Sequence, residues 1–186
     1  MYLSDLLYEQ PTDFSIVQSD CSDFIHESNY HLVYRALPRS YNDIHRVKVR
    51  QQKHTDVVTR VFNEAFRETP NIRQRSIISQ STPPIPTINT EPYYIFPVNG
   101  YKYMYSKEVK DSSADYQQLI HTMFEHLSSE EAAAKILSDV VKYSYNTTNL
   151  LEGIRTGAEI IFYNIPFYYA IKCAAYPNTK TLISYL

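Results

Sequence analysis

The chain has 186 residues, a formal net charge of −2, 44% hydrophobic residues and 20% charged residues. These values are typical of a globular protein, and they argue against wholesale disorder and against an overall electrostatic footprint for nucleic acid. Only three glycines are present, which excludes the glycine-rich phosphate loops of Rossmann and P-loop proteins. We therefore expect a single α+β domain over residues 1–186.

The first half of the chain contains two recognisable elements before a loop. Residues 31–37 alternate like a strand that Pro38 ends. Apolar residues recur at helical spacing over residues 57–66, and Pro70 is expected to stop that helix. The short β-prone stretch 76–79 then leads into an irregular proline-rich loop.

That loop, residues 83–92, is followed by the clearest turn signal of the chain. Residues 93–97 and 101–105 both favour strands, and they flank Asn99-Gly100. Because this dipeptide suits the tight turn of a hairpin, we expect the two strands to pair with each other.

Helices and then strands dominate the rest of the chain. One apolar stripe combines Tyr116, Leu119, Ile120, Met123, Phe124 and Leu127, and a second combines Ala133, Ile136, Leu137, Val140 and Val141. A third helix should end at Gly157. Residues 159–163 and 167–171 favour strands. The expected fold is α+β, with small mixed or antiparallel sheets and a helical insertion at about 112–156.

The sequence contains neither a recognisable metal-binding motif nor a reactive cysteine pair. His121, Glu125 and His126 lack the spacing of the zinc-protease motifs, and residues five apart lie on different helix faces, so no metal site is expected. Cys173 lies in an apolar segment, and with Cys21 it forms no CxxC pair, so we expect reduced, unreactive thiols.

The N-terminal sequence lacks the basic and apolar regions of a signal peptide. No apolar run approaches the roughly 20 residues that cross a bilayer. We expect a cytoplasmic protein without a membrane partner, and the oligomeric state stays open.

A basic stretch runs from Arg46 to Arg75, with eight Lys or Arg against three Asp or Glu. It fits the solvated face of the helix over residues 57–66. It also fits contacts to phosphate, in a nucleotide or in a nucleic-acid backbone, for which Arg46 and Arg50 are suited. Both interpretations stay open.

Three separated segments resemble the toxin-like ADP-ribosyltransferases, in which an arginine ends the first strand, a Ser-Thr-Ser-like turn follows a second, and a glutamate opens a late strand. Val33-Tyr34-Arg35-Ala36-Leu37 resembles the arginine strand. Ile78-Ser79-Gln80-Ser81 resembles the turn, with Gln80 in place of threonine, and Ala158-Glu159-Ile160-Ile161-Phe162 resembles the glutamate strand. Gly157 stands where arginine-modifying members carry Gln or Glu, so this departure puts an arginine acceptor in doubt. Residues 76–110 also resemble uncharacterised proteins of large tailed phages.

The resemblance implies an ADP-ribosyltransferase-like fold and NAD as substrate. Glu159 would stabilise the oxocarbenium character that develops as nicotinamide leaves its ribose. Arg35 would bind the pyrophosphate, and Ser79 would position Glu159 or the ribose. Ser81 would assist in binding the cofactor, and the rings of Tyr93 and Tyr94 would stack on nicotinamide.

The preferred hypothesis is thus an ADP-ribosyltransferase-like protein that binds NAD and transfers ADP-ribose to an unknown protein or nucleic-acid acceptor. One alternative is a non-enzymatic phage accessory or virion protein that acts through protein–protein contacts, in the host cytoplasm or the virion. Another is a nucleic-acid-binding module that uses the basic segment 46–75.

Overall fold

A computed structural model of the chain describes residues 13–49, 56–69, 71–127 and 129–186. Within these residues it has seven helices and one antiparallel sheet of seven strands. The helices are α1 (Phe14–Asp20), α2 (Ser22–Glu27), α3 (Val57–Ala65), α4 (Ser112–Phe124), α5 (Glu130–Ser144), α6 (Leu150–Arg155) and α7 (Thr179–Ser184). The strands are β1 (Val33–Pro38), β2 (Ile44–Lys48), β3 (Ile77–Gln80), β4 (Thr90–Pro97), β5 (Lys102–Tyr105), β6 (Glu159–Tyr163) and β7 (Phe167–Lys172). The α+β class expected from the sequence is confirmed.

The sheet has the order β2-β7-β4-β1-β3-β6-β5, and it is weakest in its middle. Strands β1 and β3 share the single pair Tyr34↔Gln80, whereas the other neighbouring strands share four to six pairs. The strands form one antiparallel sheet, where the sequence left small mixed or antiparallel sheets open. The narrow connection still divides it into a four-stranded part, β2-β7-β4-β1, and a three-stranded part, β3-β6-β5.

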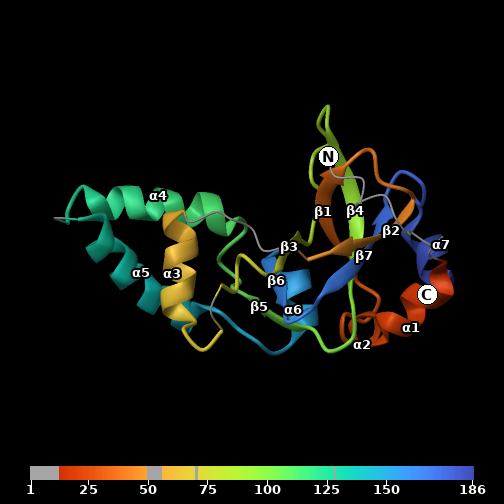
Figure 1. Cartoon of the computed structure of the whole chain (residues 1–186), viewed down its shortest axis with the longest axis horizontal. Helices are drawn as coiled ribbons and strands as arrows, with labels where there is room; N and C mark the ends of the chain where they lie inside the picture. The colour runs from red at the N-terminus through yellow and green to blue at the C-terminus, as the bar shows by residue number, and fades with distance from the viewer. Residues whose placement is uncertain (1–12, 50–55, 70, 128) are drawn as a thin grey trace.

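The helices are distributed between these two parts (Figure 1). Helices α1, α2 and α7 lie beside the four-stranded part, whereas α3, α4 and α5 form a separate group beyond the three-stranded part. One apolar core includes Phe24 of α2 and strand residues from both parts. A second core joins Phe62 of α3, Leu137 of α5 and Ile161 of β6. Each group of helices therefore buries its own apolar face against the sheet.

The prediction of a hairpin at Asn99-Gly100 is wrong. Strands β4 and β5 each pair with other partners, and three strands separate them in the sheet. The reason is that Asn99 contacts the N-terminal helices: its Oδ1 accepts from the backbone N–H of Asp23 at 2.9 Å, and its Nδ2 donates to the carbonyl of Ser19 at 3.0 Å. Gly100 has a φ of +81°, which suits glycine, and the turn redirects the chain instead of folding it back.

Most local expectations agree with the structure to within a few residues. Strand β6 has the expected bounds, and β7 is one residue longer than expected. Strand β4 begins at Thr90, so the end of the expected proline-rich loop is part of the sheet. Helix α3 ends at Ala65, and Pro70 lies outside the described residues. Strand β2 was missed because its two apolar residues, Ile44 and Val47, are three positions apart and so show no alternation.

Helices α4, α5 and α6 occupy the chain between β5 and β6. Gly157 follows α6 with a φ of +73°, as a residue that ends a helix often does. Among the described residues, no helix has the length and apolar composition that a bilayer-spanning segment needs.

Candidate functional site

The three segments that resemble the transferase signals are neighbours in the sheet. Arg35 lies on β1, Ser79 on β3 and Glu159 on β6, and these strands are consecutive in the order β1-β3-β6. Tyr34 pairs with Gln80, which in turn pairs with Glu159. A continuous row of three residues therefore crosses the middle of the sheet.

The side chains of Arg35, Ser79 and Glu159 do not share a face. Paired residues of antiparallel strands point to the same side, and successive residues alternate. Glu159 thus lies on the face of Tyr34 and Gln80, whereas Arg35 and Ser79 are each displaced by one residue and point to the opposite face. A displacement of one position is enough to reverse the side of a strand residue.

Glu159 is buried beneath the first turn of α4. Its Oε2 accepts the backbone N–H of Ser112, the first residue of that helix, at 3.0 Å. Burial raises the pKa of the carboxyl group above its usual 4.5, while the hydrogen bond from the backbone of Ser112 and the charge of Arg73 oppose that rise. A carboxylate at a helix N-terminus is favourably placed, so Glu159 fastens α4 to β6.

A polar cluster surrounds this carboxyl group in the interior. Arg73 is 6% exposed and donates through Nη2 to the Oγ of Ser113 at 2.8 Å, with its guanidinium 5.1 Å from the ring centre of Phe62. Burial raises the pKa of Tyr145, and Tyr116 and Glu159 add to that rise. Sequence reasoning missed this cluster because Arg73 was counted with the surface charges of the basic stretch.

Three other expected residues lie in the sheet or at its edge. Ser79 is fully buried, and its Oγ has no hydrogen-bond partner among the described residues. The Oγ of Ser81 donates to the carbonyl of Ala158 at 3.1 Å, which ties the end of β3 to the start of β6. Half-buried Arg35 pairs in register with Tyr93 of β4. None of these contacts marks a ligand.

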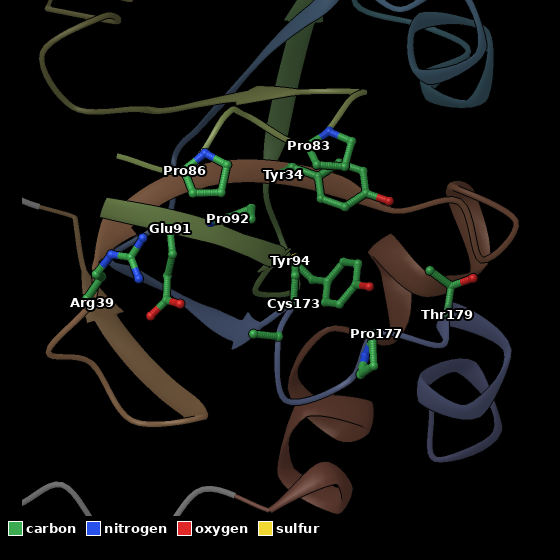
Figure 2. Close-up of a pocket in the computed structure, with 11 residues that line it drawn as sticks. Tyr34, Arg39, Pro83, Pro86, Glu91, Pro92, Tyr94, Cys173, Pro177 and Thr179 are labelled. Carbon is green, nitrogen blue, oxygen red and sulfur yellow. The ribbon is translucent and has the colours of Figure 1, made fainter. Parts of the chain in front are cut away.

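A pocket of about 580 Å³ opens on the Tyr34 face of the four-stranded part (Figure 2). The rings of Tyr34 and Tyr94 lie 5.3 Å apart at 46°. Tyr94 also donates from its hydroxyl to the carbonyl of Tyr176 at 3.1 Å, and burial raises its pKa to about 12. We call this cavity the tyrosine pocket. Its lining consists of Tyr34, Arg39, Pro83, Pro86, Glu91, Pro92, Tyr94, Cys173, Ala174, Pro177 and Thr179.

One end of the tyrosine pocket is charged. Arg39 donates from Nε and Nη2 to the carbonyl of Thr87, at 3.0 and 2.8 Å, and so is held beside the proline-rich loop. Glu91 also lines the pocket, but its carboxylate accepts from the hydroxyl of Tyr93 at 3.4 Å and pairs with Lys172 at 3.2 Å on the opposite face of the sheet. Burial raises the pKa of Cys173 to about 12, which keeps its thiol protonated and a poor nucleophile at neutral pH.

Of the two tyrosines expected to contact a cofactor, only Tyr94 lines the pocket. Tyr93 points to the other face and donates from its hydroxyl to the carbonyl of Pro38 at 3.3 Å. Tyr34 and Arg39 were not singled out from the sequence as pocket residues. Alternation along β1 predicts that Tyr34 and Arg35 face opposite ways, so the pattern contained part of the signal.

The basic stretch is not one surface in the part of the chain that the structure describes. Arg46 of β2 lies 3.7 Å from the ring centre of Phe167, at one edge of the sheet. Arg60 of α3 pairs with Glu130 of α5, in the helical group at the other end (Figure 1). Arg50 lies outside the described residues. The described arginines therefore offer no continuous track for a nucleic-acid backbone.

Comparison with known proteins adds no assignment: no protein-family model, curated protein or solved structure matches this chain. Within the described residues, no three His, Cys, Asp or Glu side chains gather closely enough to hold a metal ion. The tyrosine pocket and the row that leads from it to Glu159 are therefore the features of the described residues that bear on function.

Proposed function

We propose that this chain is an ADP-ribosyltransferase-like protein that binds NAD in the tyrosine pocket and transfers ADP-ribose to an unknown acceptor. The observation that carries the proposal is the row Tyr34–Gln80–Glu159. It connects a wall of the pocket to the glutamate that resembles the catalytic residue of the family. Neighbouring strands lie about 4.8 Å apart, so β6 is roughly 10 Å from β1 along this row.

The lining of the pocket suits part of a dinucleotide. Two tyrosine rings provide surfaces on which a nicotinamide or adenine ring can stack. Arg39 stands at the same cavity and brings a permanent positive charge for a phosphate. In this proposal Arg39 takes the phosphate contact that the resemblance implied for Arg35, because Arg35 points to the other face of the sheet.

Transfer places a further requirement on Glu159. The carboxylate must face the ribose as positive charge develops there, yet it accepts a hydrogen bond from the backbone of Ser112 in a buried position. Transfer by Glu159 therefore requires the start of α4 to move. Binding of NAD in the pocket does not require α4 to move. Binding and transfer are therefore tested separately.

Binding is tested by thermal unfolding with and without NAD. A ligand at 100 times its dissociation constant stabilises the folded state by about 2.7 kcal/mol. Tyr34→Ala and Arg39→Gln should both reduce the stabilisation, whereas Tyr143→Ala, at a residue 84% exposed on α5, should leave it unchanged. Equal stabilisation of all four proteins would place NAD elsewhere, and no stabilisation of the wild type would end the proposal.

Transfer is tested by incubating the protein with labelled NAD and candidate acceptor extracts. We expect label on an acceptor with the wild type and none with Glu159→Gln, while Glu159→Gln retains the thermal response to NAD. If both proteins label the acceptor equally, Glu159 is not catalytic. If neither does, the chain transfers no ADP-ribose in that extract, and the thermal response alone decides whether it binds NAD.

A second candidate function is a non-enzymatic role through protein–protein contacts. Five large apolar side chains are exposed on the hairpin of α4 and α5, which favours a surface for association. This role requires no NAD. A stable complex without any thermal response to NAD would favour it over the transferase.

A further inference from the structure

Helix α5 has two apolar sides, and only one of them is covered. Leu137 and Val141 are fully buried in the core that α5 shares with α3 and α4. Ile136, Val140 and Tyr143 are 48%, 51% and 84% exposed. Steps of four and then three residues place these three side chains in one line along the helix, which is the spacing by which paired helices contact each other.

The neighbouring helix also exposes large apolar side chains. Helix α4 packs against α5 and exposes Leu119 at 40% and Phe124 at 50%. Of the ten large apolar side chains exposed among the described residues, five therefore belong to these two helices. Such a concentration is typical of a surface that another protein covers.

A row of charges runs beside the apolar line. Glu131, Lys135, Asp139 and Lys142 are all exposed on α5, and their signs alternate. When two copies of a helix lie antiparallel, the same flank of each faces the other. Asp139 and Lys135 flank the apolar line, whereas Glu131 and Lys142 lie further round the helix. With a two-fold axis at the level of Leu137, Lys135 then faces Asp139 of the second copy, and this pair occurs twice by symmetry.

We propose that the chain forms a two-fold symmetric dimer in which the exposed faces of α5 lie antiparallel. Ile136 of one copy meets Val140 of the other, and this apolar contact supplies the affinity. The charge row sets direction and register, because exposed ion pairs add little affinity while like charges in contact are unfavourable. The dimer is independent of NAD binding and lies far from the tyrosine pocket in the fold (Figure 1).

The same charges also have a role within one helix. Glu131 and Lys135, and Lys135 and Asp139, are four residues apart, and such pairs stabilise an isolated helix by a few tenths of a kcal/mol. Alternation alone therefore does not identify a partner. The decisive experiment changes the charges on two different copies, because contacts within a helix do not respond to what the other copy carries.

The mass of the wild-type protein should be measured by analytical ultracentrifugation at several protein concentrations. We expect a dimer whose dissociation constant rises at least tenfold in Val140→Asp. Glu108→Gln, at an exposed site outside the helices, is the matched control and should leave the dimer unchanged. A monomeric wild type at all concentrations, or a dimer that Val140→Asp does not weaken, would overturn the proposal.

Charge reversal tests the antiparallel arrangement. Lys135→Glu alone brings like charges together twice in a homodimer, and so does Asp139→Lys alone, so each variant should dimerise at least tenfold more weakly. A mixture of the two restores both opposite-charge pairs, so it should form a heterodimer of near wild-type affinity, visible by native mass spectrometry. If the mixture associates no better than either variant alone, the antiparallel register is wrong.

Discussion

The two parts of the sheet differ in how they treat buried polar groups. In the four-stranded part, the hydroxyls of Tyr93, Tyr94 and Tyr169 all donate hydrogen bonds within the protein. Beside the three-stranded part, Arg73, Ser112, Tyr145 and Glu159 each keep one buried polar atom without a partner among the described residues. Groups of this kind cost stability, so they call for an explanation.

The two parts of the sheet therefore differ in the role that each can have. In the four-stranded part these tyrosines tie the strands to the segments around them, which suits a pocket that must keep its shape. The three-stranded part carries a buried carboxyl group that fastens a helix, and the proposed transfer requires this contact to open. Four predictions test this comparison, from the largest expected effect to the smallest.

The largest effect is expected where the two parts meet. Phe24 of α2 contacts Phe96 of the four-stranded part and Phe162 of the three-stranded part, at ring-centre distances of 5.9 and 5.7 Å. Phe24→Ala should lower the free energy of unfolding by about 3–5 kcal/mol, as measured by urea denaturation. Phe124→Ala, at a residue 50% exposed, is the control and should cost far less. Equal losses would contradict the joining role of Phe24.

A smaller loss is expected at the turn that replaces the hairpin. Asn99→Ala removes the side-chain hydrogen bonds to Asp23 and Ser19, each worth about 0.5–1.5 kcal/mol. The free energy of unfolding, measured by urea denaturation, should therefore fall by about 1–2 kcal/mol. Asn89→Ala, in an exposed loop, is the matched change and should have almost no effect. A neutral Asn99→Ala would mean that the turn does not depend on α1 and α2.

The buried carboxyl group should be visible in the pH dependence of stability. Burial raises the pKa of Glu159 in the folded state, so its contribution is present below pH 4.5 and is lost as the pH rises through the raised pKa. Glu159→Gln keeps an acceptor for the Ser112 N–H and removes the titration. The variant should therefore lose less stability than the wild type between pH 4.5 and neutrality. Glu108→Gln is the exposed control, and identical profiles of wild type and Glu159→Gln would refute the shift.

The smallest effect is expected at the surface pair between Arg60 and Glu130. Both side chains are about half exposed, at 52% and 51%, and such pairs contribute about 0–1 kcal/mol. Arg60→Ala should lower stability by no more than this, and added salt should reduce the difference further. A loss comparable to that of Phe24→Ala would show that this pair holds α3 on α5, and the comparison would have to be revised.

Patterns within short segments of the sequence predicted many of the helices and strands. A short run of β-branched and aromatic residues defined β6. Gly157, the third of the three glycines, marked the end of α6 because a positive φ is easy for glycine. The apolar stripes of α4 and α5 included Tyr116, Ile120, Leu137 and Val141, which are buried, but also Leu119, Phe124, Ile136 and Val140, which are exposed. These predictions need only neighbours a few residues away.

The candidate site was harder to predict, because it depends on which strands pair and in what register. The sequence identified Tyr94, yet it assigned Tyr93 to the same ligand, and only the pairing of β4 shows that their side chains face opposite sides. Arg73 was indistinguishable from the surface arginines around it until its burial was known.

The sequence by itself determined an α+β chain, because composition and periodicity act over one turn of helix or one strand. The tertiary structure alone decided three matters: that β4 and β5 separate, that Glu159 lies beneath α4 instead of beside Arg35, and that Ile136 stays uncovered on its helix. Each depends on contacts between residues far apart in the chain, and a shift of one residue in register reverses the side on which a side chain lies.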